Sequence, residues 1–157
     1  VEALGVPQDG AAGVFLLLKD TLELLEQSEN VQDILPILFR LRLASQQGYA
    51  PALTACVSCG KKDFDHAGFL VSEGTIVCPD CVSGRGNIVE ISGKSLDVLR
   101  QVQEVSPLHW HFLTSGSSEE AGGVLLPAER RECARAVDGF VQYHLGLTWD
   151  RGRFRRM

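Results

Sequence analysis

The sequence has no apolar run that approaches the roughly 20 residues needed to span a bilayer, and no stretch has the pattern of a secretory signal peptide. It also has no glycine-rich phosphate loop, no Ser–His–Asp arrangement and no paired acidic motif. Internal repeats and long low-complexity tracts are missing too. We therefore expect no membrane association and no enzymatic activity.

An initiator methionine is also missing, because the chain begins at Val1. From this we expect the sequence to be a piece of a longer chain. Its 157 residues are 45% hydrophobic, which is enough for one ordinary globular domain with its own core.

Charge is spread unevenly along the chain. The net charge of −5 excludes a uniformly basic surface. However, residues 101–157 hold seven acidic and seven basic side chains, and four arginines lie in the last seven positions. Nucleic-acid binding depends on where charges sit more than on their sum, so a local basic patch stays open as a hypothesis.

Helical periodicity dominates both ends of the sequence. It predicts a helix over residues 11–28 and a second one after Asn30, in which Pro36 implies a kink or a later start. Further helices are expected after Ser92 and from about Pro127 to Leu145. The expected apolar face of the first helix is Ala11, Val14, Phe15, Leu18, Leu22 and Leu25, and that of the last is Cys133, Ala136, Val137, Phe140, Val141 and His144.

The middle of the chain has a different character. Residues 69–71 and 75–77 are β-like and flank Ser72-Glu73-Gly74, which predicts a hairpin. We expect a mainly α fold, a helical bundle with an inserted four-cysteine zinc finger that contains a short β-hairpin. The predicted division is 1–50 as the first part of the helical domain, 51–87 as the zinc-binding insert, and 88–157 as the second helical part with a basic tail. Residues 115–123 are expected to form a surface loop.

Four of the five cysteines form two C-x-x-C pairs. Cys56 and Cys59 make the first pair, and Cys78 and Cys81 make the second after 18 intervening residues. This spacing is typical of a four-cysteine zinc site, because each pair brings two thiolates to one metal and a hairpin brings the pairs together. The sequence therefore predicts one structural Zn²⁺ bound by Cys56, Cys59, Cys78 and Cys81.

The alternatives are weaker. Two disulfides would call for a secretory context, and four paired free thiols would be a coincidence. Catalytic zinc is disfavoured because four thiolates leave no open position and the deaminase His-x-Glu pattern is missing. His66 is interpreted as a surface histidine, and Cys133 as a small buried thiol on an apolar helical face.

Arginines are the candidate DNA-binding residues. Arg131 and Arg135 lie four positions apart on the last predicted helix and share a face. If the arginines converge in space, they make a phosphate-binding surface whose affinity falls with salt. Alternatively, Glu129 and Glu132 neutralise the helix arginines and the tail is merely solvated. The candidates are Arg130, Arg131, Arg135, Arg151, Arg153, Arg155 and Arg156; Lys61 and Lys62 on the zinc turn are weaker ones.

These motifs together resemble a known family. Gly48-Tyr49-Ala50-Pro51 stands shortly before Cys56-Val57-x-Cys59-Gly60, and Tyr143-His144-Leu145-Gly146 precedes a short arginine-rich tail. With Leu41-Arg42-Leu43 and Leu53, this pattern resembles the zinc-bearing part of the RecO family of DNA repair proteins. The resemblance covers roughly residues 35–157.

The resemblance implies a bacterial recombination mediator in the cytoplasm, associated with the nucleoid. Such proteins anneal complementary single strands and, with RecR, help load the recombinase onto DNA coated by single-stranded DNA-binding protein. The implied partners are single-stranded DNA, a RecR-like protein and the tail of single-stranded DNA-binding protein. The family normally carries an N-terminal OB-fold, and no such five-stranded segment is found here. The alternative function is a zinc-bearing protein-interaction module that does not itself bind DNA.

Overall fold

The computed structural model describes residues 11–27, 33–110, 125–150 and 153–156, with 147–150 and 153–156 described by their backbone. The helices are α1 (Ala11–Gln27), α2 (Leu35–Gln46), α3 (Gly93–Glu104) and α5 (Pro127–Leu145), with short 3₁₀ turns η4 (Pro79–Cys81) and η5 (Pro107–His109). The strands are β1 (Ala52–Cys56), β2 (His66–Leu70), β3 (Thr75–Val77), β4 (Ile88–Ser92), β5 (Leu147–Asp150) and β6 (Arg153–Arg156). The expectation of a mainly α fold is confirmed at this level.

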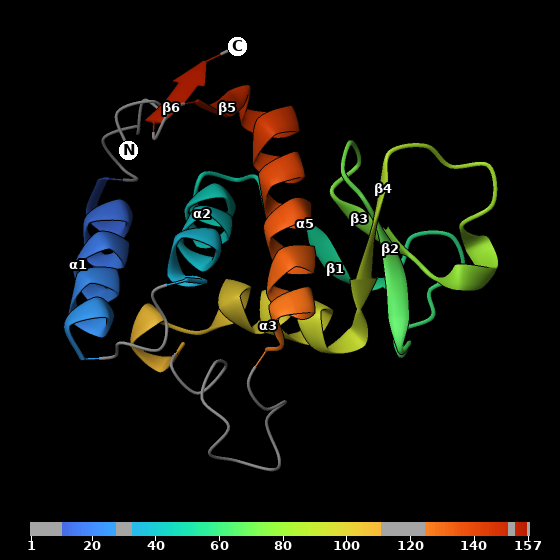
Figure 1. Ribbon diagram of the computed structural model, residues 1–157, viewed down its shortest axis with the longest axis horizontal. Coiled ribbons are helices and arrows are strands. Elements are labelled where there is room, and N and C mark those ends of the chain that lie inside the picture. The colour runs from blue at the N-terminus through green and yellow to red at the C-terminus, as the bar shows by residue number, and fades with distance from the viewer. Residues whose placement is uncertain (1–10, 28–32, 111–124, 151–152, 157) are drawn as a thin grey trace.

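The helices form one layer beside a small sheet (Figure 1). Helices α1, α2 and α5 stand side by side, and α3 crosses one end of α2 and α5. The four-stranded sheet lies on the far side of α5 from α1. The sheet has the order β1-β3-β2-β4, in which β1 runs parallel to β3 and the other neighbours are antiparallel. The expected hairpin is present as β2 and β3, paired from Gly68↔Val77 to Leu70↔Thr75.

Strands β1 and β4 were not predicted from the sequence. Strand β4 pairs with β2 over its whole length and packs against α5. The outer edge of β1 is covered by α3, because the Arg100 side chain donates to the Leu53 carbonyl (2.6 Å) and Gln103 donates to the Pro51 carbonyl (3.0 Å). An edge whose carbonyls are occupied in this way offers little to a foreign strand.

Helix starts and ends follow the expected signals. Pro36 lies in the first turn of α2, where its missing N–H costs no hydrogen bond, so the later start is confirmed. Ser92 caps α3 by accepting from the Ser95 amide (3.3 Å). Gly146 ends α5 in the left-handed conformation.

The predicted face of α1 was right at Val14 and wrong at its other positions. The structure buries Val14, Leu17, Thr21 and Leu24, whereas Phe15, Leu18, Leu22 and Leu25 are exposed. The helix is apolar on two adjacent sides, so periodicity alone did not identify the inward one. The buried row lies about 100° around the helix from the exposed row, because each member of the first precedes a member of the second by one residue.

One continuous core joins the helices to the sheet. Its buried side chains come from α1, α2, α3 and α5 and also from the sheet, through Leu53, Phe69 and Ile76. Phe140 of α5 is buried as expected, with its ring 6.1 Å from the Phe69 ring. The chain division at residues 50 and 87 stays a prediction.

The arginine-rich end of the chain has a backbone structure that the sequence did not suggest. Strands β5 and β6 pair antiparallel, with Leu147 opposite Arg156 and Asp150 opposite Arg153. The predicted loop at 115–123 lies outside the described residues. Among the helices that the structure describes, none is long and apolar enough to cross a membrane.

Candidate metal centre

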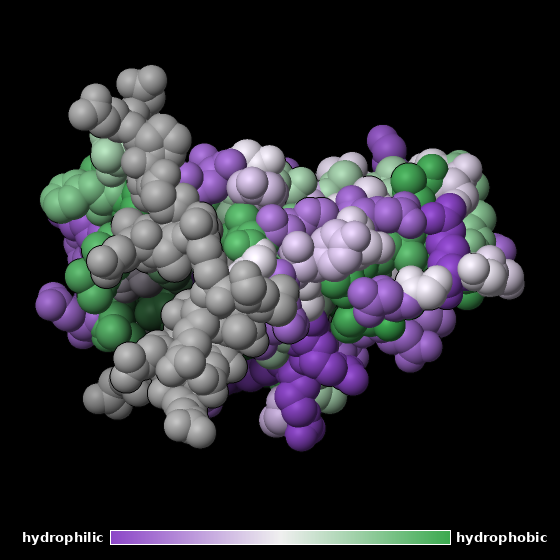
Figure 2. All heavy atoms as spheres, turned by 90° about the horizontal axis from the view of Figure 1, so that it is seen from above, coloured by the Kyte–Doolittle hydropathy of each residue, from purple (hydrophilic) through white to green (hydrophobic). Residues whose placement is uncertain are grey.

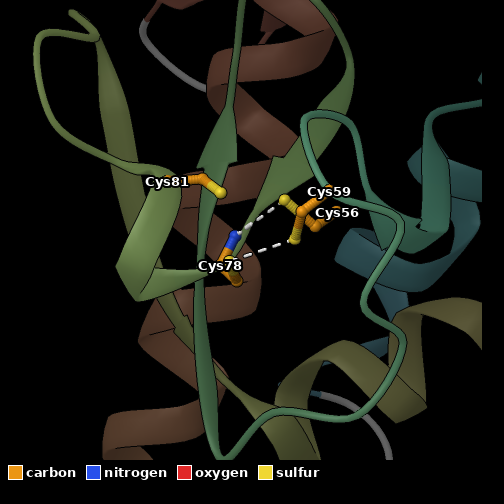
Figure 3. Close-up of side chains that lie close together, drawn as sticks. All are labelled: Cys56, Cys59, Cys78 and Cys81. Carbon is orange, nitrogen blue, oxygen red and sulfur yellow. Dashed lines mark hydrogen bonds between the residues drawn. The ribbon is translucent and has the colours of Figure 1, made fainter.

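The first cysteine pair lies in a tight turn that leaves β1. Cys56 is the last residue of that strand. Its carbonyl accepts from the Gly60 amide (2.9 Å), and its amide donates to the Lys61 carbonyl (2.7 Å). Gly60 has a φ of +76°, which favours glycine there. This turn holds the Cys56 and Cys59 side chains on the same side of the backbone (Figure 3).

The second pair follows β3. Cys78 is extended and precedes η4, where Pro79 stands in the first turn. The Cys81 amide donates to the Cys78 carbonyl (3.0 Å), which closes the second turn. Because β1 and β3 are neighbours in the sheet, with Cys56 opposite Ile76, both turns emerge at the same end of the sheet.

The four sulfurs converge on one point. The Sγ atoms of Cys56, Cys59, Cys78 and Cys81 all lie within 4.8 Å of one another, and they are the one such group among the described residues. Cys59 Sγ and Cys78 Sγ are 3.7 Å apart. Four sulfurs at about 2.3 Å from a tetrahedral zinc ion would be about 3.8 Å apart. The cluster therefore has the size of a zinc–tetrathiolate site, and four such ligands leave no position for a substrate.

Burial and a backbone amide support the inner half of the cluster. Cys56 and Cys78 are buried with Leu70 and Val77, whereas Cys81 is half-buried and Cys59 is exposed. The Cys78 amide donates to Cys56 Sγ (3.3 Å). An N–H group directed at sulfur stabilises a thiolate and orients it toward a metal.

The close spacing of the four sulfurs shifts the pKa values of the cysteines in opposite directions. Burial raises the pKa of Cys56, but the backbone amides of Cys78, Cys59 and Ser58 more than offset it and lower that pKa to about 6. Hydrogen bonding with the Cys78 and Cys59 side chains, together with burial, raises the pKa of Cys81 to about 12. The Lys61 amide lowers the pKa of Cys59, but the Cys56 and Cys78 side chains together with burial outweigh it, so that pKa is raised. Four thiolates at this spacing need a cation between them.

The other candidate ligands lie elsewhere. His66 is exposed and is not part of the sulfur cluster, as expected. Cys133 is fully buried on α5, where its Sγ lies 3.8 Å from the Ser95 carbonyl. Burial raises the pKa of Cys133 to about 12, so this thiol is uncharged at neutral pH.

The arginines of α5 have different surroundings. Arg130 forms an ion pair with Asp33 (3.5 Å) and donates to the Leu125 carbonyl (3.2 Å). Arg131 and Arg135 are exposed, one turn apart. The Arg130–Asp33 pair was not predicted, because Asp33 is distant from Arg130 in the chain and no local sequence pattern indicates such a contact.

The tail arginines are placed only through the backbone. Arg153, Arg155 and Arg156 belong to β6, which pairs with the strand that directly follows α5. Arg151 lies outside the described residues. Lys61 forms an exposed ion pair with Asp80 (3.9 Å) at the cysteine turns, and Lys62 is exposed.

Comparison with known proteins agrees with these motifs. A family model described as "Recombination protein O C terminal" matches residues 1–153. A DNA repair protein RecO of Nitratidesulfovibrio vulgaris (strain DP4) is 47% identical over 163 residues, and one of Oleidesulfovibrio alaskensis is 42% identical over 159. One of Lawsonia intracellularis is 37% identical over 157 residues. Each match covers 100% of this chain. No solved structure matches this chain significantly.

The matched relatives are longer than this chain. The chain spans 61% of the N. vulgaris protein and 60% of the other two. The family model covers nearly the whole chain, and its description refers to the C-terminal part of the family. On these matches and motifs, the chain belongs to the RecO family of DNA repair proteins.

Proposed function

We propose that the four cysteines bind one Zn²⁺ ion with a purely structural role. The 3.7 Å sulfur separation and the amide directed at Cys56 support this assignment. Bound zinc would tie the turn after β1 to the turn after β3, two strands that otherwise share a short and irregular parallel pairing. Zinc-binding free energy would thereby stabilise the fold of this segment.

We further propose that the protein acts as a recombination mediator in DNA repair and contacts single-stranded DNA through phosphate. The observation that carries this proposal beyond family membership is the exposed pair Arg131 and Arg135 on α5. The two arginines lie on the solvent side of a helix whose other side, with Val137 and Phe140, is buried. Their backbone positions are therefore fixed by the core, while their guanidinium groups reach solvent.

Phosphate contact is the form of binding that suits strand annealing. A protein that pairs any two complementary strands must bind without reading bases, and arginine forks match phosphate oxygens. The tail arginines Arg151, Arg153, Arg155 and Arg156 would add further phosphate contacts, since the strands β5 and β6 follow the C-terminal end of α5. Arg130 would have to exchange its Asp33 partner for a phosphate, so it contributes less.

The protein partners belong to the same proposal. By family, we expect a RecR-like protein and the tail of single-stranded DNA-binding protein, at a cytoplasmic site on the bacterial nucleoid, with no enzymatic step of its own.

Fluorescence anisotropy with a labelled oligo(dT) strand tests the DNA proposal. Arg131→Ala together with Arg135→Ala should weaken binding and reduce the log–log salt slope by roughly 0.7 for each lost contact. The matched variant with lysine at both positions keeps the charges and should keep the slope. Lys19→Ala on α1 controls for loss of any exposed positive charge. An alanine variant with unchanged affinity and slope would remove this pair from the DNA surface.

A second candidate is a zinc-bearing protein-interaction module that binds no DNA. It is favoured by the ion pairs that occupy other basic residues, such as Arg85 with Glu73 and Lys94 with Glu129. It predicts no anisotropy change for the unsubstituted chain even at low salt. The oligo(dT) titration therefore separates the two functions before any variant is made.

A further inference from the structure

Helix α1 carries a row of exposed apolar side chains, which we call the outer seam: Phe15, Leu18, Leu22 and Leu25. Phe15 is 67% exposed and Leu22 is 51% exposed. In Figure 2, hydrophobic atoms gather at the end of the molecule that α1 forms. Four large apolar side chains in one row are more than the scattered exposed residues found on most soluble surfaces.

The spacing of the outer seam is that of a helix-packing surface. Successive members are separated by three, four and three residues, which is the a/d pattern of a heptad. The inward row of α1, with Val14, Leu17, Thr21 and Leu24, has the same spacing and is buried. A helix that is apolar on more than one side is typical of an element covered on both. Within the described residues, only the inward row is covered.

We propose that the outer seam of α1 is the contact surface for the part of the protein that its longer relatives carry outside the matched region. The 163 aligned residues are 61% of the N. vulgaris relative, so roughly 100 of its residues lie outside the match. The matching family model describes the C-terminal part of the family, so those residues come earlier in the relative's chain. Helix α1 is the first described element and the one nearest to them in sequence.

The size of the seam favours an occupant within the same polypeptide over a second copy. A 17-residue helix is about 26 Å long. One face of it falls short of the roughly 800 Å² that each partner of a stable complex usually buries. A tethered segment needs less area, because its effective concentration at the seam is high. On this proposal, the outer seam is covered in the longer protein and exposed to solvent in the 157-residue chain.

The test introduces one charge into the seam in two chain lengths. Leu22→Glu is placed in the 157-residue chain and in the complete reading frame of the same gene. The matched control is Leu16→Glu, because Leu16 is 55% exposed but lies about 120° around α1 from Leu22. Circular dichroism of the 157-residue variants shows whether α1 still folds. Thermal unfolding and binding of the dye ANS, which reports exposed apolar surface, are then measured in all six proteins.

In the 157-residue chain, both variants should melt within about 2 °C of the unsubstituted protein, since both sites are exposed. In the longer protein, Leu22→Glu should lower the melting temperature by about 5 °C or more and raise ANS fluorescence, while Leu16→Glu leaves both unchanged. Equal effects of the two variants in the longer protein, or a reading frame that adds no segment, would overturn the proposal. So would a dimer of the 157-residue chain in sedimentation that Leu22→Glu dissociates and Leu16→Glu does not, since a second copy would then occupy the seam.

Discussion

Gly74, in the turn between β2 and β3, lies directly against the ring of Phe140 on α5. A Cβ atom at Gly74 would come within 2.8 Å of Phe140 Cε2. Gly74 also has a φ of +62°, a conformation that other residues rarely adopt. The turn between β2 and β3 can therefore pack closely against α5 only because residue 74 has no side chain.

Gly74→Ala should destabilise the protein by about 2–4 kcal/mol, through backbone strain added to a steric conflict with Phe140. Gly84→Ala is the matched control, because Gly84 has a φ of +78° and nothing within 4 Å of an added Cβ. It should cost only the strain, about 1 kcal/mol. Urea unfolding of both variants measures the difference. Equal destabilisation would mean that the Phe140 ring moves aside freely.

Phe140→Ala should cost about 3–5 kcal/mol, because the buried ring contacts both the sheet and its own helix. Its centroid is 6.1 Å from that of Phe69 and 4.4 Å from that of His144. Combining Phe140→Ala with Gly74→Ala provides a double-mutant cycle. The Gly74→Ala penalty should shrink in the Phe140→Ala background, because the conflicting ring is gone. A loss below about 1 kcal/mol for Phe140→Ala would contradict its burial.

Cys78→Ser should release the metal and destabilise the predicted zinc-binding insert, residues 51–87, while the helices stay largely formed. Cys78 supplies a buried sulfur, so the change leaves three sulfur ligands, while the residue 78 amide that donates to Cys56 Sγ is kept. Elemental analysis of protein purified without chelator should give one zinc per chain before the change and much less after it. Cys133→Ser removes a buried thiol outside the cluster and should keep the full zinc content. Unsubstituted protein without zinc would refute the assignment.

Glu132→Gln should destabilise the protein at pH 7 by about 1–3 kcal/mol, because a charged acceptor is replaced. Glu132 accepts from the Ser92 amide (3.0 Å), the Ser92 hydroxyl (2.8 Å) and the Ser95 hydroxyl (2.9 Å). Burial raises the pKa of Glu132, but these bonds from Ser92 and Ser95, with the Arg135 charge, outweigh it and lower that pKa.

The pH dependence of that effect has a definite sign. Because the pKa of Glu132 is lower in the folded state, its stabilisation is present above the unfolded-state pKa and is lost as pH falls through the folded-state pKa. Unfolding free energies of the two proteins should therefore converge on acidification. Glu104→Gln, at an exposed position on α3, is the control and should follow the unsubstituted protein at every pH. A Glu132→Gln effect that persists unchanged at low pH would contradict the role of the charge.

Alanine at all four tail arginines, Arg151, Arg153, Arg155 and Arg156, should weaken binding of single-stranded DNA about equally for different sequences. The loss of phosphate contacts should also reduce the slope of log affinity against log salt concentration by roughly 0.7 for each contact. Anisotropy titrations with two unrelated oligonucleotides at several salt concentrations measure both effects. A variant that weakens one sequence much more than the other would point to base contacts instead.

The parts of the fold that follow local rules were predictable from the sequence. Ser92 and Gly146 mark helix ends because capping depends on a few neighbouring residues. The cysteine cluster was predictable for a similar reason, since the C-x-x-C spacing fixes two short turns whatever surrounds them. The assembled cluster confirms that the four sulfurs meet.

Other parts depended on contacts between distant residues. The inward side of α1 is chosen by its neighbours, and Thr21 is buried there while Phe15 is not. Strand β1 was missed because its five residues show little alternation of apolar and polar side chains. It also pairs in parallel with β3, the second strand of the hairpin, and not with the strand that follows it in the chain. Partners such as Asp33 for Arg130 have no signature in either segment alone.

The place of α5 in the chain has a consequence for biosynthesis. This helix contributes Ala136, Val137, Phe140 and Val141 to the core, and it follows α1, α2, α3 and the four-stranded sheet in sequence. Those elements emerge from the ribosome before α5. The apolar side chains that α5 covers in the folded protein therefore stay exposed in the nascent chain until this helix is translated. The two cysteine pairs, by contrast, are close in sequence and can meet while translation continues. The proposed zinc ion would then be bound before α5 completes the core, and it would hold β1 and β3 together until that helix packs against the sheet.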